Sequence, residues 1–194
     1  MSVGLLIAIV VAVAVVAFVW LTYNQLVARR LAASNSWAQI DVALRRRHDL
    51  IPALVDSVKG YASHERTTFV NVTEARSAAV NAESPPNRAA AESTLARAVD
   101  GLLVVAEAYP QLEASENFAA LQHELSETED QIAITRRVYN DTVETYNTAI
   151  QVFPAVIVAR SFGFDAKGFF DAPDAAEQAP VVSLSPTSPE GRSR

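Results

Sequence analysis

The side chains best suited to metal chemistry in this chain are three histidines, His48, His64 and His123. Di-metal sites in helical bundles take a Glu-x-x-His pair from each of two helices, because residues three apart share a helix face. The positions three residues before the histidines hold Arg45, Tyr61 and Ala120 instead of glutamate. H-E-x-x-H, Walker and G-x-S-x-G motifs are also absent from the sequence. We therefore predict no metal site, no cofactor and no catalytic residue, and we expect the histidines at the surface or at a corner.

A basic triplet, Arg45–Arg47, is followed directly by His48 and Asp49. We interpret Arg45, Arg46, Arg47 and Asp49 as a candidate interaction surface. In a bundle the triplet should lie level with the acids Glu124, Glu127, Glu129 and Asp130, and we predict that it pairs with some of them. Exposed ion pairs contribute only about 0–1 kcal/mol each, so these pairs would select neighbouring helices more than add stability. The alternative is a free basic patch that docks an acidic partner.

A Tyr-Asn pair occurs twice, seven residues apart, as Tyr139-Asn140 and Tyr146-Asn147. Seven residues are two helical turns, so both pairs should face the same side of one helix. We interpret the tyrosines as core residues with satisfied hydroxyl groups. A binding role for the two asparagines is the alternative.

The uncharged run Val3–Leu21 predicts a membrane anchor. Its 19 residues are long enough to cross the hydrocarbon core of a bilayer as a helix. We therefore assign residues 1–22 to an uncleaved transmembrane segment, with a cleaved signal peptide as the alternative. The residues expected at the membrane surface are Trp20, Tyr23, Arg29 and Arg30. Since basic residues collect on the cytoplasmic side, we predict a single-pass protein with its N-terminus outside and its body in the cytoplasm.

Residues 23–170 show helical periodicity and almost no strand signals. Helices are predicted over about residues 23–44, 51–79, 87–108 and 115–153. In the last of these, large residues recur every seven positions, which is typical of helices packed side by side; they are Phe118, Leu125, Ile132, Tyr139, Tyr146 and Phe153. We predict an all-α fold, with an N-terminal transmembrane helix followed by an up-and-down four-helix bundle.

The turn between the first two helices has two possible positions. Asp49 can cap a new helix and Pro52 would then lie in its first turn, which favours a corner at these residues. The apolar spacing also permits one long helix, kinked at Pro52 and turning near Gly60–Ser63.

The chain after the fourth helix should return to the membrane. An up-and-down bundle brings residues 155–170 to the end where the first helix leaves the bilayer. Phe162, Phe164, Phe169 and Phe170 should then face either the bilayer interface or, as we favour, the base of the bundle. Residues 171–194 are rich in Pro, Ser and Ala, which predicts a disordered tail.

Several motifs in this order resemble the LemA family of bacterial membrane proteins. The resemblance covers nearly all of the chain except the tail. It is carried by YNQLV (23–27), WAQIDVALRRRHDLIPALVDSVKGYASHE (37–65), EAYPQL (107–112), LQHELSETEDQIAITRRVYN (121–140) and YNTAIQVFP (146–154). Ala53 departs from the family pattern, which usually has Asn after the proline. The resemblance implies a bacterial cell membrane location, an outside N-terminus and a helical cytoplasmic bundle, and it implies no established enzymatic activity.

We predict a non-enzymatic scaffold or adaptor that contacts the lipid bilayer and presents its bundle to a protein partner. The sequence leaves the partner and the oligomeric state open. A membrane-organising or lipid-sensing protein is the alternative function. The net charge of −6 argues against nucleic acid as a ligand, because nucleic-acid-binding proteins carry a basic surface.

Overall fold

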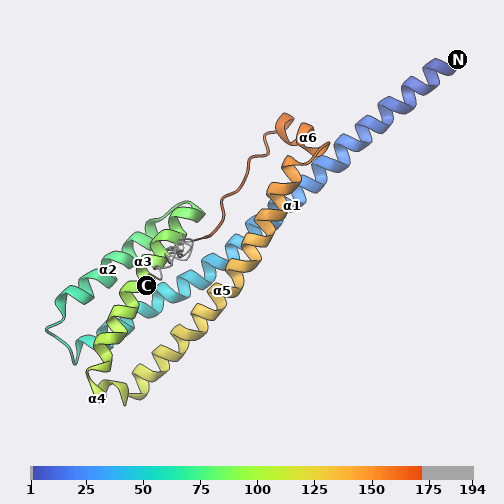
Figure 1. The fold of residues 1–194 in the computed structure, drawn as a ribbon. Helices are drawn as coiled ribbons and strands as arrows, with labels where there is room; N and C mark the ends of the chain where they lie inside the picture. The colour runs from blue at the N-terminus through green and yellow to red at the C-terminus, as the bar shows by residue number, and fades with distance from the viewer. Residues whose placement is uncertain (1, 172–194) are drawn as a thin grey trace, which may run out of the picture.

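The computed structural model describes residues 2–171 and shows an elongated helical protein (Figure 1). Over this range the chain contains helices, turns and one extended segment, and no strand. The helices are α1 (Val3–Lys59), α2 (Arg66–Asn81), α3 (Pro85–Glu107), α4 (Pro110–Glu113), α5 (Glu116–Gln151) and α6 (Ala155–Ser161). The all-α prediction is confirmed. The predicted tail, residues 171–194, lies outside the described residues apart from Asp171.

The helix α1 continues through Pro52 to Lys59, so the predicted corner at Asp49 and Pro52 is wrong. The turn follows Lys59, close to the alternative position at residues 60–63. Ile51, Leu54 and Val58 are at most 2% exposed, so the buried face of α1 runs past the proline without a break. Burying side chains of this kind contributes about 1.5–3 kcal/mol each. Together they outweigh the roughly 3 kcal/mol that a proline costs inside a helix.

Another helix compensates for the backbone hydrogen bond that Pro52 cannot make. Proline has no N–H, so in an α-helix it leaves the carbonyl four residues earlier without its donor. Here that carbonyl belongs to His48, and Arg76 Nε on α2 donates to it at 2.7 Å. The side chain of Pro52 itself points to solvent. The helix is therefore kept intact by a residue 24 positions away along the chain.

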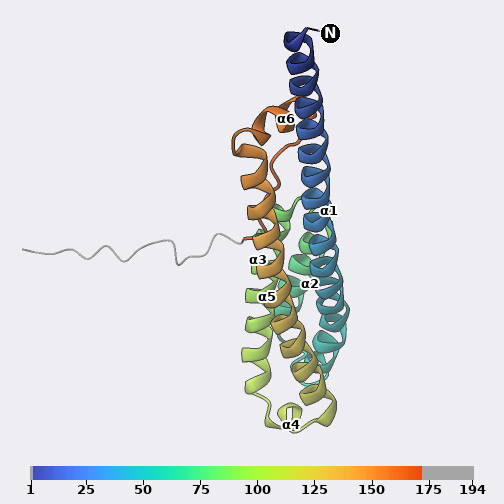
Figure 2. The ribbon, with the colours of Figure 1, turned by 90° about the vertical axis from the view of Figure 1, so that its right-hand side faces the viewer.

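The four long helices form the predicted up-and-down bundle, with α1 along α5 and α2 along α3 (Figures 1 and 2). The helices α2 and α3 cover only the half of the bundle far from the N-terminus. Three hydrophobic clusters follow one another along α1 and α5. We call them distal, central and proximal; their largest members include Leu102 and Phe118, then Ile40 and Tyr139, then Leu26 and Tyr146.

The seven-residue pattern of α5 is confirmed over five of its six positions. Phe118, Leu125, Ile132, Tyr139 and Tyr146 are all at most 8% exposed. Phe153 is 80% exposed, so its predicted place in the core is wrong. The helix ends at Gln151, and the heptad geometry does not extend to a residue beyond the helix.

Candidate functional site

A cluster of charged side chains is buried in the middle of the bundle. It consists of Arg47 and His48 on α1, Glu92 on α3 and Glu129 on α5, and we call it the buried ion cluster. Arg47 Nη2 lies 2.9 Å from Glu92 Oε2, and Arg47 Nη1 lies 2.9 Å from Glu129 Oε1. Arg47 also donates to the backbone carbonyl of Glu92 at 2.9 Å. One guanidinium group therefore joins three helices.

The charged side chains in this cluster differ in their exposure to solvent. The side chains of Arg47 and Glu92 are 4% and 6% exposed, whereas that of Glu129 is 45% exposed. Partial burial raises the pKa of Glu129 above its ordinary value; Arg47 opposes this rise, and Glu92 and Asp100 add to it. Removing charges from water costs several kcal/mol per ion unless they are paired, so this cluster requires all of its members.

His48 is part of this cluster, so the prediction that it lies at the surface or at a corner is wrong. It is 5% exposed, and its Nε2 lies 2.8 Å from Glu92 Oε1. His64 and His123 are exposed, as predicted. The apolar phase of α1 already contained the signal, because His48 follows Leu44 by four residues and precedes Ile51 by three.

The basic triplet divides between the interior and the surface. The predicted pairing with the acidic tract is confirmed for Arg47 and Glu129. Arg45 is 75% exposed and pairs with Asp41 on its own helix, while Arg46 and Asp49 are exposed. Within residues 2–171, no group of three or more His, Asp and Glu side chains is arranged to hold a metal ion.

A second polar constellation fixes the extended chain after α6, residues 164–171, which we call the return segment. Tyr146 Oη donates to the carbonyl of Asp165 at 2.9 Å, and Tyr139 Oη donates to that of Gly168 at 2.8 Å. Asn147 both donates to the carbonyl of Lys167 and accepts from its N–H, each at 2.9 Å. Asn140 makes the same pair of bonds with Phe170, at 3.2 and 2.9 Å.

The Tyr-Asn repeat matches the repeat of an extended backbone. Seven residues of α-helix rise about 10.5 Å, and three residues of extended chain span about 10 Å. Accordingly, the bonded carbonyls of the return segment are three residues apart for both the tyrosines and the asparagines. The interpretation of the tyrosines as core residues with satisfied hydroxyls is confirmed. The asparagines bond to the backbone of their own chain, so the alternative, a binding role, gains no support from these contacts.

Side-chain contacts also fix the register of the return segment. Phe164 and Phe170 are buried, in the proximal and central clusters respectively. At Gly168, an added Cβ would lie 3.0 Å from Pro86 Cγ, closer than side-chain atoms normally approach. Phe164 therefore lies at the base of the bundle, as the favoured prediction has it, whereas Phe170 is buried at the central level. Phe162 and Phe169 are 55% and 43% exposed.

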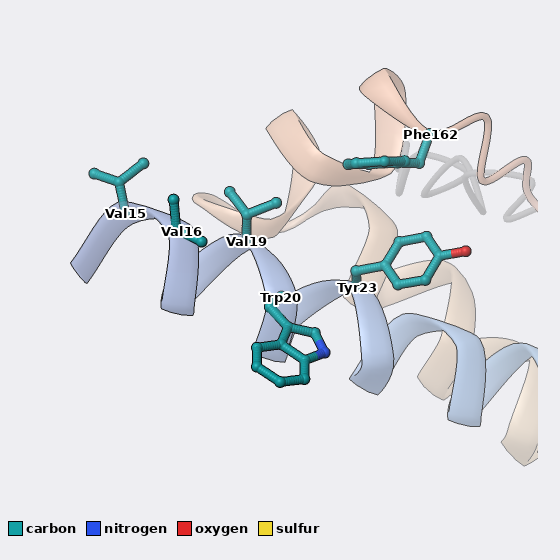
Figure 3. A pocket seen from close by; sticks show the side chains of 6 residues that line it. All are labelled: Val15, Val16, Val19, Trp20, Tyr23 and Phe162. Carbon is teal, nitrogen blue, oxygen red and sulfur yellow. The ribbon is translucent and has the colours of Figure 1, made fainter. Parts of the chain in front are cut away.

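The helix α6, which follows the C-terminal end of α5, lies against the apolar part of α1. A hollow of about 370 Å³ lies beside them. Figure 3 shows the side chains that line it: Val15, Val16, Val19, Trp20, Tyr23 and Phe162. The ring of Phe162 lies 5.0 Å from that of Tyr23. All of the lining residues are apolar or aromatic, so the hollow offers contact area and few polar partners.

The arginines beside this hollow contact the bundle. Arg29 Nη1 donates to the carbonyl of Thr145 at 3.3 Å, and the guanidinium of Arg30 lies 5.1 Å from the ring centre of Phe164. Trp20 is 67% exposed and Tyr23 is 37% exposed. One helix of the described chain is long and apolar enough to cross a membrane, and it is α1, through its N-terminal part.

Comparison with known proteins identifies the family of this chain. The LemA family model matches residues 36–184. The chain belongs to the LemA family. The matched range includes the buried ion cluster and the Tyr-Asn repeat, so both belong to the part of the chain that the family shares.

Two kinds of named relative are similar to this LemA-family chain. Protein LemA of Metamycoplasma hominis is 27% identical over 150 residues, covering 77% of this chain and 68% of the relative. Magnetosome protein MamQ 2 of Paramagnetospirillum magneticum is 23% identical over 205 residues, covering 92% and 75%. Magnetosome protein MamQ of Magnetospirillum gryphiswaldense is 23% identical over 197 residues, covering 88% and 72%.

Proposed function

We propose that this chain is a non-enzymatic, single-pass membrane scaffold, with its N-terminus outside the cell membrane and its bundle in the cytoplasm. The observation that carries the proposal is the continuity of α1, which includes both the candidate span and one full wall of the bundle. The asymmetry of basic residues, with Arg29 and Arg30 after the span and none before it, supports the orientation.

The continuity of α1 has a mechanical consequence. From Leu21 to Lys59 the helix rises roughly 57 Å at 1.5 Å per residue. The tight packing of α5 along this length supports α1 from the side. A partner bound at the end of the bundle would therefore be held at a fixed distance from the bilayer.

The polar chemistry of the bundle supports a structural role. The buried ion cluster joins α1, α3 and α5, and the Tyr-Asn repeat binds the return segment. In both sites, the groups that these polar side chains contact belong to this chain itself. The surface left for a partner includes Arg45, Arg46 and Asp49, which are exposed on α1.

Site-specific photo-crosslinking in native membranes tests the scaffold proposal. A photoreactive amino acid at Arg46 should give discrete protein adducts, whereas the same group at the exposed Glu144 on α5 serves as the matched control. Adducts with lipid alone, or the same adducts from both positions, would count against a partner surface at Arg46.

Labelling with a membrane-impermeant thiol reagent tests the orientation. The chain has no cysteine, so Asn35→Cys, at an exposed position, provides a single site. It should resist the reagent in intact cells and react after lysis, while Ser2→Cys should react in both. Labelling of the Asn35→Cys variant in intact cells would reverse the topology.

A membrane-organising role is the second candidate function. It is favoured by the apolar side chains that α6 exposes beside the candidate span, among them Ile157 and Phe162. Vesicles that change shape on reconstitution of the chain, in the absence of any other protein, would favour this function over the scaffold.

A further inference from the structure

We propose that α6 is a second membrane contact, lying in the bilayer interface beside the span of α1. This inference rests on the proposed anchoring by α1 and adds a lipid-binding surface that is distant from the span in sequence. The partner of this surface is the lipid interface.

The position of α6 relative to the span supports this first. Phe162, at the end of α6, shares the apolar hollow with Val15 and Tyr23 of α1 (Figure 3). Val15 precedes Leu21, the last residue of the apolar run Val3–Leu21, by six residues, or about 9 Å of helix. Interfacial helices bury their apolar face about 5–10 Å into the headgroup and acyl boundary. If the run crosses the bilayer, α6 therefore lies at interfacial depth.

The two faces of α6 support it second. Val158 and Ala159 are buried against the proximal cluster. Ile157 on the helix is 59% exposed. The residues that flank the helix are exposed as well: Val152 and Phe153 before it by 48% and 80%, and Phe162 after it by 55%. A group of exposed apolar side chains marks a surface that contacts another apolar phase. The adjoining phase at this level is the one that surrounds the exposed valines of the span.

The charge around α6 distinguishes lipid from a second copy of the chain. Residues 151–164 contain one charged side chain, Arg160, and no acid. Arg29 and Arg30 lie close by on α1, where Arg30 stacks on Phe164. Anionic headgroups attract such basic side chains. A second copy docked on the same face would instead bring three further basic side chains, and the nearest acid that follows α6 is the single Asp165.

The return segment fixes α6 at the end of α5. Immediately after α6, Phe164 is buried and Asp165 accepts from Tyr146. Asn147 then binds the backbone of Lys167 through two hydrogen bonds. Tyr146 and Asn147 lie on α5. These bonds therefore tie the chain after α6 back to the helix before it and hold α6 at one height in the bundle.

Lipid and aqueous quenching of a single fluorophore in the full chain tests the proposal. The reconstituted variants Ile157→Cys and Phe153→Cys carry an environment-sensitive label on α6 and just before it, respectively. Ser126→Cys, at an exposed position far from the span, is the aqueous control. Val10→Cys, in the middle of the run, reports the span separately. Vesicles contain phosphatidylcholine and phosphatidylglycerol, with and without brominated acyl chains.

We expect brominated lipid to quench the labels at positions 153 and 157, and iodide to quench them several-fold less than the label at 126. Lipid quenching at position 10 but not at 153 and 157 would overturn the inference and leave the anchor in place. Quenching by lipid at none of these positions would overturn the anchor as well. Protection from both quenchers would mean that protein covers α6, which also overturns the inference.

Discussion

Replacing Glu92 by Gln is expected to destabilise the bundle by about 3 kcal/mol, the lower end of the cost of breaking a buried ion pair, because Arg47 keeps Glu129 as its second partner. Glu92 lies 2.9 Å from Arg47 Nη2 and 2.8 Å from His48 Nε2. The side chains of Arg47 and Glu92 are 4% and 6% exposed, so water cannot replace the lost charge. Glutamine has nearly the same volume as glutamate, so the change removes charge without creating a cavity.

Urea unfolding of the full chain in detergent micelles measures this loss, with circular dichroism as the signal. The matched control is Glu127→Gln, since Glu127 is 56% exposed and surface changes usually stay within about 0.5 kcal/mol. The double variant Arg47→Met with Glu92→Leu should recover most of the stability, because it removes both buried charges. A loss from Glu92→Gln no larger than that of the control would refute the reasoning.

Three further predictions concern hydrogen bonds and protonation. Arg76→Met should cost about 1–3 kcal/mol, because the His48 carbonyl loses its donor. The cost should shrink in the Pro52→Ala background, where residue 52 has its own N–H; equal costs by chemical unfolding would contradict the compensation. Asn147→Ala should accelerate hydrogen exchange at the amide of Lys167, because this N–H donates a hydrogen bond to Asn147 Oδ1. Unchanged exchange would mean that this bond does not hold the return segment. The pKa of Glu129 is raised above 4.5 in the folded state. Folding therefore binds protons, and stability should fall as pH rises from about 4.5 through the folded pKa. Glu129→Gln should flatten this part of the stability profile, and an unchanged slope would assign the pH dependence to other groups.

The helical periodicity of the sequence predicted the bundle because burial follows helix phase. Ile132 and Tyr139 on α5 and Ile40 on α1 are all buried as the apolar spacing indicates. The spacing also predicted the level at which Arg47 meets Glu129, since rise per residue fixes height in an antiparallel pair.

The end of the first helix could not be decided from local sequence. Pro52 indicated a break, and the buried face from Ile51 to Val58 indicated continuation. Continuation is favoured in part by the hydrogen bond that Arg76 donates to the carbonyl of His48, and Arg76 lies on another helix. Local propensity does not contain a tertiary hydrogen bond of this kind.

The sequence analysis did not predict which segment the Tyr-Asn repeat binds, for a similar reason. The sequence showed the seven-residue spacing of Tyr139 and Tyr146, but not that the chain reverses after α6. The spacing did contain a signal, because seven residues of α-helix have about the same length as three residues of extended chain. A segment such as residues 164–171, with no periodicity of its own, gives no indication of where it binds.

The most direct test of the account is the length of α1 between the bilayer and the distal turn. Spin labels at Asn24→Cys and Lys59→Cys, both at exposed positions, measure it by pulsed electron resonance in the full chain in lipid nanodiscs. A continuous helix separates these positions by about 52 Å, and we predict one narrow distribution near that distance. A distribution near about 30 Å, as a corner at Pro52 would give from the same rise per residue, or a broad one, would contradict a rigid scaffold.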